Sequence, residues 1–159
     1  MSETKLASEW TLWYHPHKSD DWSQDSYMFI YRVTTAEGLW GMLNLVTEEH
    51  LKSGMYFLMR DDIFPDWSDE RNIDGGYWSL KIVDNISDIW HKWIGYMAAE
   101  VLCDTCKGSY SIQGISLSPK LNHAILKVWN SDSRYTKLSF FNKDLDIRGC
   151  KYFAFDTKI

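Results

Sequence analysis

Strand-like segments come in pairs in this chain, and single helix-like segments separate the pairs. Residues 10–14 and 26–33 are rich in aromatic and β-branched side chains, which strands favour. Residues 34–46 instead place apolar side chains at the helical period, behind a Thr34–Glu37 pattern typical of a capping box. The alternation continues, which predicts strands over 54–60, 78–83, 110–117, 123–130 and 150–155 and helices over about 88–101 and 135–145.

This order of elements predicts an α+β fold with a largely antiparallel sheet of seven or eight strands. About three helices are expected on one face of the sheet, which leaves the other face open for a ligand. The 159 residues are the length of one domain and contain no linker, repeat or low-complexity segment. We therefore expect a short polar arm over residues 1–8 and a single domain over residues 9–159.

The formal net charge of -5 argues against a protein that coats nucleic acid, because such proteins bind through many phosphate contacts. The charge is compatible with a protein that grips one nucleotide and a few phosphates. The sequence has no long apolar run and no signal-peptide pattern. We therefore expect a soluble protein that is not secreted and has no membrane partner.

Known catalytic and metal-binding motifs are absent from the sequence. It has no Gly-rich phosphate loop, nucleophile elbow or zinc-protease motif. His15 and His17 would hold a metal only if a third ligand converged on them, and exposed loop histidines are the alternative. Cys103 and Cys106 have the CxxC spacing without a second pair, which favours structural cysteines over a zinc or redox site. We expect no enzymatic activity, no cofactor and no metal site.

Two tryptophans, Trp22 and Trp67, stand apart from apolar runs, in polar loops. Loops carry binding residues disproportionately often, although an indole folded back onto the sheet edge is the alternative for Trp67. Proteins that bind single nucleotides stack the base on aromatic rings and meet its phosphates with Lys or Arg. Two indoles suit a positively charged base such as a methylated guanine, because the ring faces are electron-rich.

The spacing of the tryptophans resembles that of the eukaryotic translation initiation factor 4E family, the mRNA cap-binding proteins. The matching segments cover about residues 6–130 in the family order, and the residues after them match poorly. The segments are WTLWY (10–14), Trp22, TAEGLW (35–40), YFLMRDDIFPDW (56–67), GGYW (75–78), IW (89–90) and Trp129. The resemblance implies a curved antiparallel sheet with helices on its convex back and the cap in its concave face.

The resemblance also implies how the 7-methylguanosine cap is held. Trp22 and Trp67 would sandwich the base, the Trp67 backbone N–H would meet its O6, and Trp129 would approach the methyl group. Lys120 lies where the family has an arginine for the phosphates. An apolar residue replaces the family's lysine on the next strand, and Lys127 on the same strand face is expected to take over.

One residue departs from the family pattern at the point of base recognition. The family has a glutamate directly after the second stacking tryptophan, where it accepts hydrogen bonds from the guanine edge. Here that residue is Ser68, and hydrogen bonds to a charged group are roughly twice as strong as neutral ones. Either the affinity is lower, or Asp69 or Glu70 replaces the glutamate, or a different cap is preferred.

The predicted convex face carries a second resemblance. Trp40 matches the tryptophan that receives helical peptides of initiation factor 4G and of the 4E-binding proteins. Its usual apolar neighbours correspond to Ala36, His91 and Gly95, so a dedicated or divergent helical partner is expected. We expect a monomer that acts in the cytoplasm, that of an infected eukaryotic cell if the source is a virus.

Three functions are compatible with this pattern. The first is cap binding in translation initiation, and the second is a cap-binding repressor that cannot recruit factor 4G. The third is an interaction scaffold of the same fold that has lost cap binding and acts through Trp40. The neutral Ser68 and the missing family lysine favour the third function, whereas the presence of both Trp22 and Trp67 argues against it.

Overall fold

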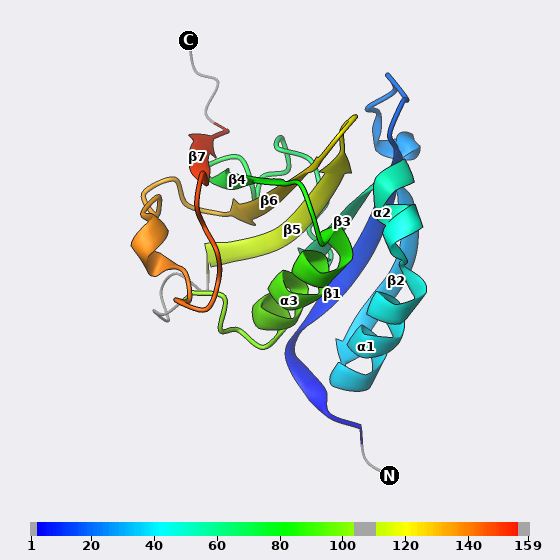
Figure 1. Cartoon of the computed structure of the whole chain (residues 1–159), viewed down its shortest axis with the longest axis horizontal. Helices are drawn as coiled ribbons and strands as arrows, with labels where there is room; N and C mark the ends of the chain where they lie inside the picture. Colours follow the sequence, from blue (N-terminus) through cyan, green and yellow to red (C-terminus); the bar gives the residue numbers. More distant parts are fainter. Residues whose placement is uncertain (1–2, 104–110, 156–159) are drawn as a thin grey trace.

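Strands paired antiparallel form one curved sheet in a computed structural model of the chain, which describes residues 3–103 and 111–155 (Figure 1). The seven strands in these residues are β1 (Lys5–Pro16), β2 (Met28–Thr35), β3 (Gly54–Arg60), β4 (Gly76–Ile82), β5 (Ile112–Pro119), β6 (Ala124–Asn130) and β7 (Lys151–Ala154). Their order is β2-β1-β3-β5-β6-β4-β7, so β4 lies between two strands that follow it in the chain. The predicted α+β class with an antiparallel sheet is confirmed.

Of the residues described, three segments form α-helices, and all three pack on the same face of the sheet (Figure 1). They are α1 (Ala36–Leu45), α2 (Glu48–Ser53) and α3 (Ile86–Ala98). Helix α1 begins after Thr35, whose hydroxyl accepts the Gly38 N–H at 3.0 Å. The cap was therefore predicted one residue early, and the Glu37 carboxylate instead accepts the Thr4 N–H at 2.6 Å. No helix in the described residues is long and apolar enough to cross a membrane.

The main core lies between the sheet and the helices. Its largest fully buried side chains are Trp10, Trp78 and Trp90. Successive strand residues point to opposite faces, so Leu126 and Val128 of β6 enter this core, whereas Lys127 and Trp129 face the other side. The sheet therefore presents one face to the helices and a second, aromatic face to a ligand.

Two predictions about the elements need correction, and one helix was missed. Residues 135–145, predicted as a helix, form only the 3-10 turn η2 (Leu138–Phe140). The backbone N–H of Asn142 bonds the Leu102 carbonyl at 2.8 Å and its amide the Val101 carbonyl at 3.0 Å, which holds the segment against the end of α3. Helix α2 was not predicted. The arm expected over residues 1–8 is strand from Lys5 onward.

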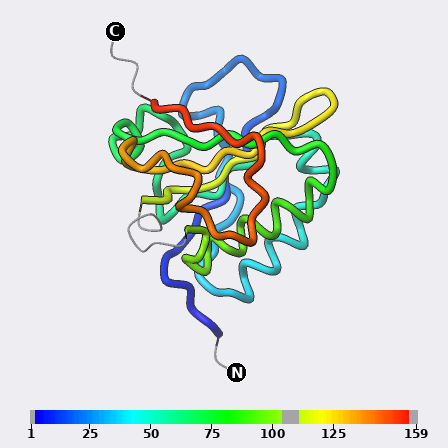
Figure 2. The backbone as a smooth tube through the Cα atoms, turned by 60° about the vertical axis from the view of Figure 1, so that its left-hand side comes forward, coloured from blue at the N-terminus to red at the C-terminus, as the bar shows by residue number. Residues whose placement is uncertain are grey.

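Two connections lie together at one end of the molecule. They are the loop after β1, which leads through the 3-10 turn η1 (Gln24–Ser26), and the turn between β5 and β6. Figure 2 shows both at the top, the first in blue and the second in yellow, and Figure 1 agrees. This end therefore carries Trp22 in the first connection and Lys120 in the second.

Candidate functional site

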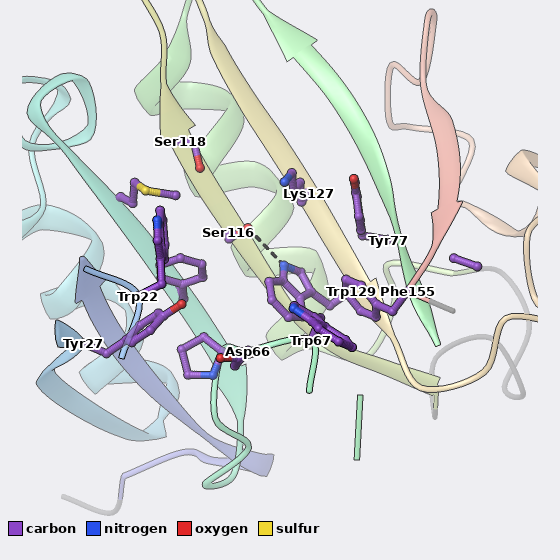
Figure 3. A pocket seen from close by; sticks show the side chains of 14 residues that line it. Trp22, Tyr27, Asp66, Trp67, Tyr77, Ser116, Ser118, Lys127, Trp129 and Phe155 are labelled. Carbon is purple, nitrogen blue, oxygen red and sulfur yellow. Dashed lines mark hydrogen bonds between the residues drawn. The ribbon is translucent and has the colours of Figure 1, made fainter. Parts of the chain in front are cut away.

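A cavity of about 470 Å³ opens on the face of the sheet opposite the helices (Figure 3). Strands β3 to β6 form its floor, and the loops that follow β1 and β3 form its two walls. Half of its lining side chains are aromatic: Trp22, Tyr27, Phe57, Trp67, Tyr77, Trp129 and Phe155. Such a lining suits a flat, conjugated ligand.

Trp22 forms one wall and is 48% exposed. One face of its indole stacks on the buried imidazole of His15, with 3.9 Å between ring centroids and 3° between planes. The Tyr27 ring lies 6.2 Å from Trp22 and 5.0 Å from His15. Because His15 covers one face of the indole, the opposite face is the one available to a ligand.

Trp67 lies across the cavity and is 45% exposed (Figure 3). Its loop is held by the buried side chain of Asn72, which donates to the carbonyl oxygens of Phe64 at 3.0 Å and Asp66 at 2.9 Å. Within the described residues, the backbone N–H of Trp67 has no hydrogen-bond partner. The indole and this N–H are thus both available at the same wall.

Trp129 forms the floor and is 6% exposed. Its indole N–H donates to the Ser116 hydroxyl at 3.0 Å, and its ring lies 5.2 Å from Phe155 and 6.3 Å from Phe57. These contacts fix the orientation of the Trp129 ring, because rotating the ring would break its hydrogen bond to Ser116 on the neighbouring strand. The floor is therefore built from a fixed ring on a strand, whereas the two walls are loops.

The positive charge of the site comes from Lys127. Its ammonium lies 4.6 Å above the Tyr77 ring at the cavity edge. Burial lowers the pKa of Lys127, and repulsion from Lys120 lowers it further. Lys120 itself is exposed on the β5–β6 turn and lines an adjacent cavity of about 280 Å³. Two lysines thus lie near one end of the aromatic cavity.

The structure brings together four of the predicted cap-site residues, Trp22, Trp67, Lys127 and Trp129, whereas Ser68, Asp69, Glu70 and Lys120 do not line the cavity.

Asp69 is turned into its own loop. Its carboxylate accepts the Arg71 backbone N–H at 2.9 Å and the Arg71 guanidinium at 3.2 Å. Burial raises the pKa of Asp69, but the hydrogen bonds from Arg71 outweigh burial and hold the value below its usual range. Arg71 also bonds Asp62 at 2.6 Å. This carboxylate is therefore engaged in holding the loop.

Asp66 is the acid that sequence reasoning missed. It lines the cavity directly before Trp67, and its Oδ1 accepts both the Ser68 backbone N–H at 2.9 Å and the Ser68 hydroxyl at 3.0 Å. Ser68 thus acts as a support for Asp66. The only signal in the sequence was the acid next to the loop tryptophan. Whether the side chain of Asp66 points into the cavity depends on the conformation of the turn, which residue type alone does not determine.

The predicted partner-binding residues lie on or between α1 and α3. Trp40 on α1 is 54% exposed. On α3, the His91 Nε2–H donates to the Leu43 carbonyl at 3.1 Å and links the two helices. A Cβ added at Gly95 would meet no atom within 4 Å, and Ala36 is half-buried. Trp40 and Gly95 are accessible, whereas His91 has a structural contact.

The residues weighed as metal ligands do not converge. The described part of the chain has no group of three His, Cys, Asp or Glu side chains able to hold an ion. His15 is fully buried, so the expectation of an exposed loop histidine is wrong at this position. Cys103 and Cys150 are both buried, and Cys106 lies outside the described residues.

Comparison with known proteins gives one consistent result. The family model "Eukaryotic initiation factor 4E" matches residues 5–147, further toward the C-terminus than the motifs alone indicated. The Saccharomyces cerevisiae eukaryotic translation initiation factor 4E is 31% identical over 130 residues, which cover 78% of this chain and 60% of that protein. The Eremothecium gossypii protein of the same name is 31% identical, with 84% and 65% covered. The chain thus spans less than two thirds of either relative.

Solved structures show the same fold. The complex of Ascaris suum eIF4E-3 with m7G cap superposes with a TM-score of 0.81 at 18% identity, covering 99% of this chain and 94% of that one. The schistosome eIF4E complexed with m7GpppG and 4E-BP gives a TM-score of 0.76 at 19% identity, covering 85% and 76%. At these identities the superpositions describe the fold alone.

Proposed function

Since this chain belongs to the eukaryotic initiation factor 4E family, we propose that it binds the 7-methylguanosine cap of mRNA and acts in translation initiation. The observation that carries the proposal is a single cavity with a half-exposed tryptophan, Trp22 or Trp67, on each of two walls. Each base–aromatic stack contributes about 1–3 kcal/mol. The m7G cap and m7GpppG in the Ascaris and schistosome structures support the same class of ligand here.

The aromatic lining selects a methylated base. Methylation at N7 gives guanine a positive charge, and a cation over an indole face is attracted by the electron-rich ring. Trp129 on the floor offers an apolar surface for the methyl group. An unmethylated guanine lacks both the charge and the methyl contact, so it should bind more weakly.

The guanine edge is read by Trp67 and Asp66. The free Trp67 backbone N–H donates to O6, as the family resemblance implies. The Asp66 carboxylate lines the cavity, and Oδ2 makes no hydrogen bond within the described residues, so this oxygen can accept from the guanine N1–H and amino group. Asp66 would thereby supply the charge that Ser68 lacks. Asp69 and Glu70 are set aside, because neither lines the cavity.

The phosphates extend from the base toward Lys127 and Lys120. Lys127 lines the cavity and Lys120 is close enough to lower its pKa. A triphosphate placed along these lysines would relieve their mutual repulsion. This arrangement suits a short phosphate chain, which agrees with the modest number of cations in an acidic protein.

The convex face is proposed to bind a helical peptide of the kind that initiation factor 4G and the 4E-binding proteins provide. Trp40 is the exposed anchor. The schistosome structure contains 4E-BP, and a Caenorhabditis elegans eIF4E-3 structure contains the 4E-binding protein Mextli. His91 bonds to Leu43 and Gly95 leaves open space, so the partner here should fill that space with a larger side chain.

Retention on immobilised 7-methylguanosine triphosphate tests the proposal. The purified protein should stay on the resin through a GTP wash and elute with the free methylated triphosphate. Equal elution by GTP would exclude a cap-specific site, and no retention at all would favour the scaffold function. Adding the protein to a cell-free translation system then distinguishes the two cap-binding functions. An initiation factor should support synthesis from capped mRNA, as it would in the cytoplasm, whereas a repressor should lower it.

A further inference from the structure

The cavity has a buried histidine behind its first stacking ring. His15 lies near the end of β1, opposite Met55 of β3, and its side chain has no exposed surface. It is covered by the Trp22 ring on one side and flanked by Tyr27. A buried polar side chain is costly unless its hydrogen bonds are satisfied, so its partners decide its chemical state.

Both ring nitrogens of His15 face carbonyl oxygens. Nδ1 lies 2.8 Å from the Pro16 oxygen, and Nε2 lies 2.7 Å from the Asp21 oxygen. A carbonyl oxygen can only accept, and a neutral imidazole carries a single N–H, so neutral His15 would set one lone pair against an oxygen. The imidazolium has two N–H donors and satisfies both contacts.

The same two contacts control Trp22. The Asp21 carbonyl belongs to the peptide bond that leads directly into Trp22, and the Trp22 ring lies flat on the imidazole at 3.9 Å. A cation within about 6 Å of an indole centroid is attracted to the ring face. His15 therefore holds this residue twice, through its backbone and through its ring.

We propose that His15, as an imidazolium, is the positioning residue of the cavity: it ties the loop carbonyls of Pro16 and Asp21 and fixes the plane of Trp22 on which a base stacks. The dependence of base binding on His15 rests on the proposed function. The protonation of His15 and its hold on Trp22 do not, because they concern the free protein.

Asp21 and Tyr27 are titratable residues beside His15. From its own loop, the Asp21 carboxylate accepts the Ser23 N–H at 2.9 Å, and the hydrogen bonds from Ser23 lower the pKa of Asp21, with a smaller contribution from His15. Directly before β2, Tyr27 stays neutral, since burial raises its pKa to about 12. Met55 on β3 is uncharged. The negative charge of Asp66, on the Trp67 loop, also raises the pKa of Tyr27.

The consequence is that the Trp22 wall depends on the proton that His15 carries. In a neutral His15, only one of the two carbonyl contacts can be a hydrogen bond, and the loop that carries Trp22 is released at the other. Base binding should therefore be weaker when His15 is neutral.

The first test uses the free native chain with ¹⁵N-labelled histidine. At pH 6 the two His15 nitrogen signals, assigned by their loss in His15→Gln, should both be those of protonated nitrogens. Trp22 fluorescence, taken as the difference from Trp22→Phe, should change with the same midpoint on raising the pH. One unprotonated nitrogen at pH 6 would overturn the proposal.

The second test measures affinity for 7-methylguanosine triphosphate from pH 6 to 8.5. His15→Phe keeps a flat ring behind Trp22 but loses both tethers, and should bind about tenfold more weakly at pH 6, as expected for a lost hydrogen bond to a charged group. The difference between native and His15→Phe affinity should shrink as the pH rises. Because both proteins bind the same nucleotide, taking this difference cancels any titration of the nucleotide itself. The neighbouring histidine gives the matched control, His17→Gln, which should behave as native.

The outcomes of the two tests separate the proposals. Equal affinity and equal pH slope in the native chain and His15→Phe would overturn the positioning role. If the native chain binds no cap analogue at any pH, the proposed function fails, and the nitrogen signals and the Trp22 fluorescence still decide whether His15 is the charged support. If His15→Phe does not fold, the native-chain measurements decide alone.

Discussion

The side-chain amide of Asn72 donates to the Asp66 carbonyl oxygen at 2.9 Å, which ties the residue before Trp67 to the far end of its own loop. Asn72 has no exposed surface. This amide holds the loop together with the Asp69 carboxylate, so the position of Trp67 depends in part on Asn72, which does not line the cavity.

Replacing this amide should therefore damage both stability and binding. Asn72→Ala removes the bonds to Phe64 and Asp66, and each lost hydrogen bond costs about 0.5–1.5 kcal/mol, since both carbonyl oxygens still accept a backbone N–H. Urea unfolding and titration with 7-methylguanosine triphosphate measure the two effects. Asn122→Ala, at an exposed turn position, is the control. Unchanged affinity in a destabilised Asn72→Ala would mean that the loop is held by other contacts.

The two wall tryptophans should dominate ligand binding. Trp22→Ala or Trp67→Ala removes one stacked ring, which corresponds to about 1–3 kcal/mol, or roughly tenfold or more in affinity. Each should also remove part of the fluorescence quenching that the cap analogue produces. Trp40→Ala is the matched control, because Trp40 is also about half exposed but lies on the helix face. An effect of Trp40→Ala equal to the others would contradict the assignment of the cavity.

Asp66 and Asp69 should respond differently to loss of charge. Asp66→Asn should weaken cap binding roughly tenfold, because a hydrogen bond to a charged group contributes about 1.5–3 kcal/mol. Asp69→Asn should instead lower the free energy of unfolding through its lost contacts with Arg71. Ser68→Glu adds a second acid beside Asp66 and should not tighten binding. Tighter binding by Ser68→Glu would show that the family's guanine contact is vacant here.

Lys127 should make the stability of the chain depend on pH. Its pKa is lower in the folded chain than the ordinary 10.5, chiefly through burial. The folded state thus binds fewer protons, so the free energy of unfolding should rise with pH from the lowered value up to 10.5. Lys127→Gln should abolish this rise and reduce both the affinity for the triphosphate and its salt dependence. Lys81→Gln, an exposed lysine on β4, should do neither.

Two glycines should respond oppositely to alanine. Gly95 lies within α3 with open space at its Cβ position, so Gly95→Ala should raise the free energy of unfolding by about 1 kcal/mol. At Gly114 on β5 a Cβ would collide with the Met59 sulfur, and Gly114→Ala should cost about 1–3 kcal/mol. Thermal unfolding of the two variants measures both. A destabilised Gly95→Ala would indicate that α3 needs the glycine for another reason.

Much of the fold could be predicted from local pattern. The strand and helix periods along the chain determine which segments pair and which pack, and the structure follows them except at residues 5–8, at 135–145 and in α2. In 135–145, hydrogen bonds from Asn142 to the end of α3 replace those of a helix. Helix α2 has only six residues, too few to show a periodic stripe.

The site was predictable only where residue type alone suggests the role. Trp22 and Trp67 could be selected because an indole in a polar loop is unusual, and Lys127 because strand alternation fixes its face. Asp66 and Asn72 could not, because a turn decides which of several adjacent polar residues points inward. Similarly, nothing near His15 in the sequence shows that both its nitrogens meet carbonyl oxygens.

The position of β4 in the sheet has a consequence for synthesis on the ribosome. β4 emerges before both of its neighbours, β6 and β7, and pairing between distant segments forms late. Tyr77 on β4, Trp129 on β6 and Phe155 after β7 line one cavity. The cavity is therefore complete only after β7 has been made, and a nascent fragment that ends before β6 contains Trp22 and Trp67 but lacks Trp129 and Phe155.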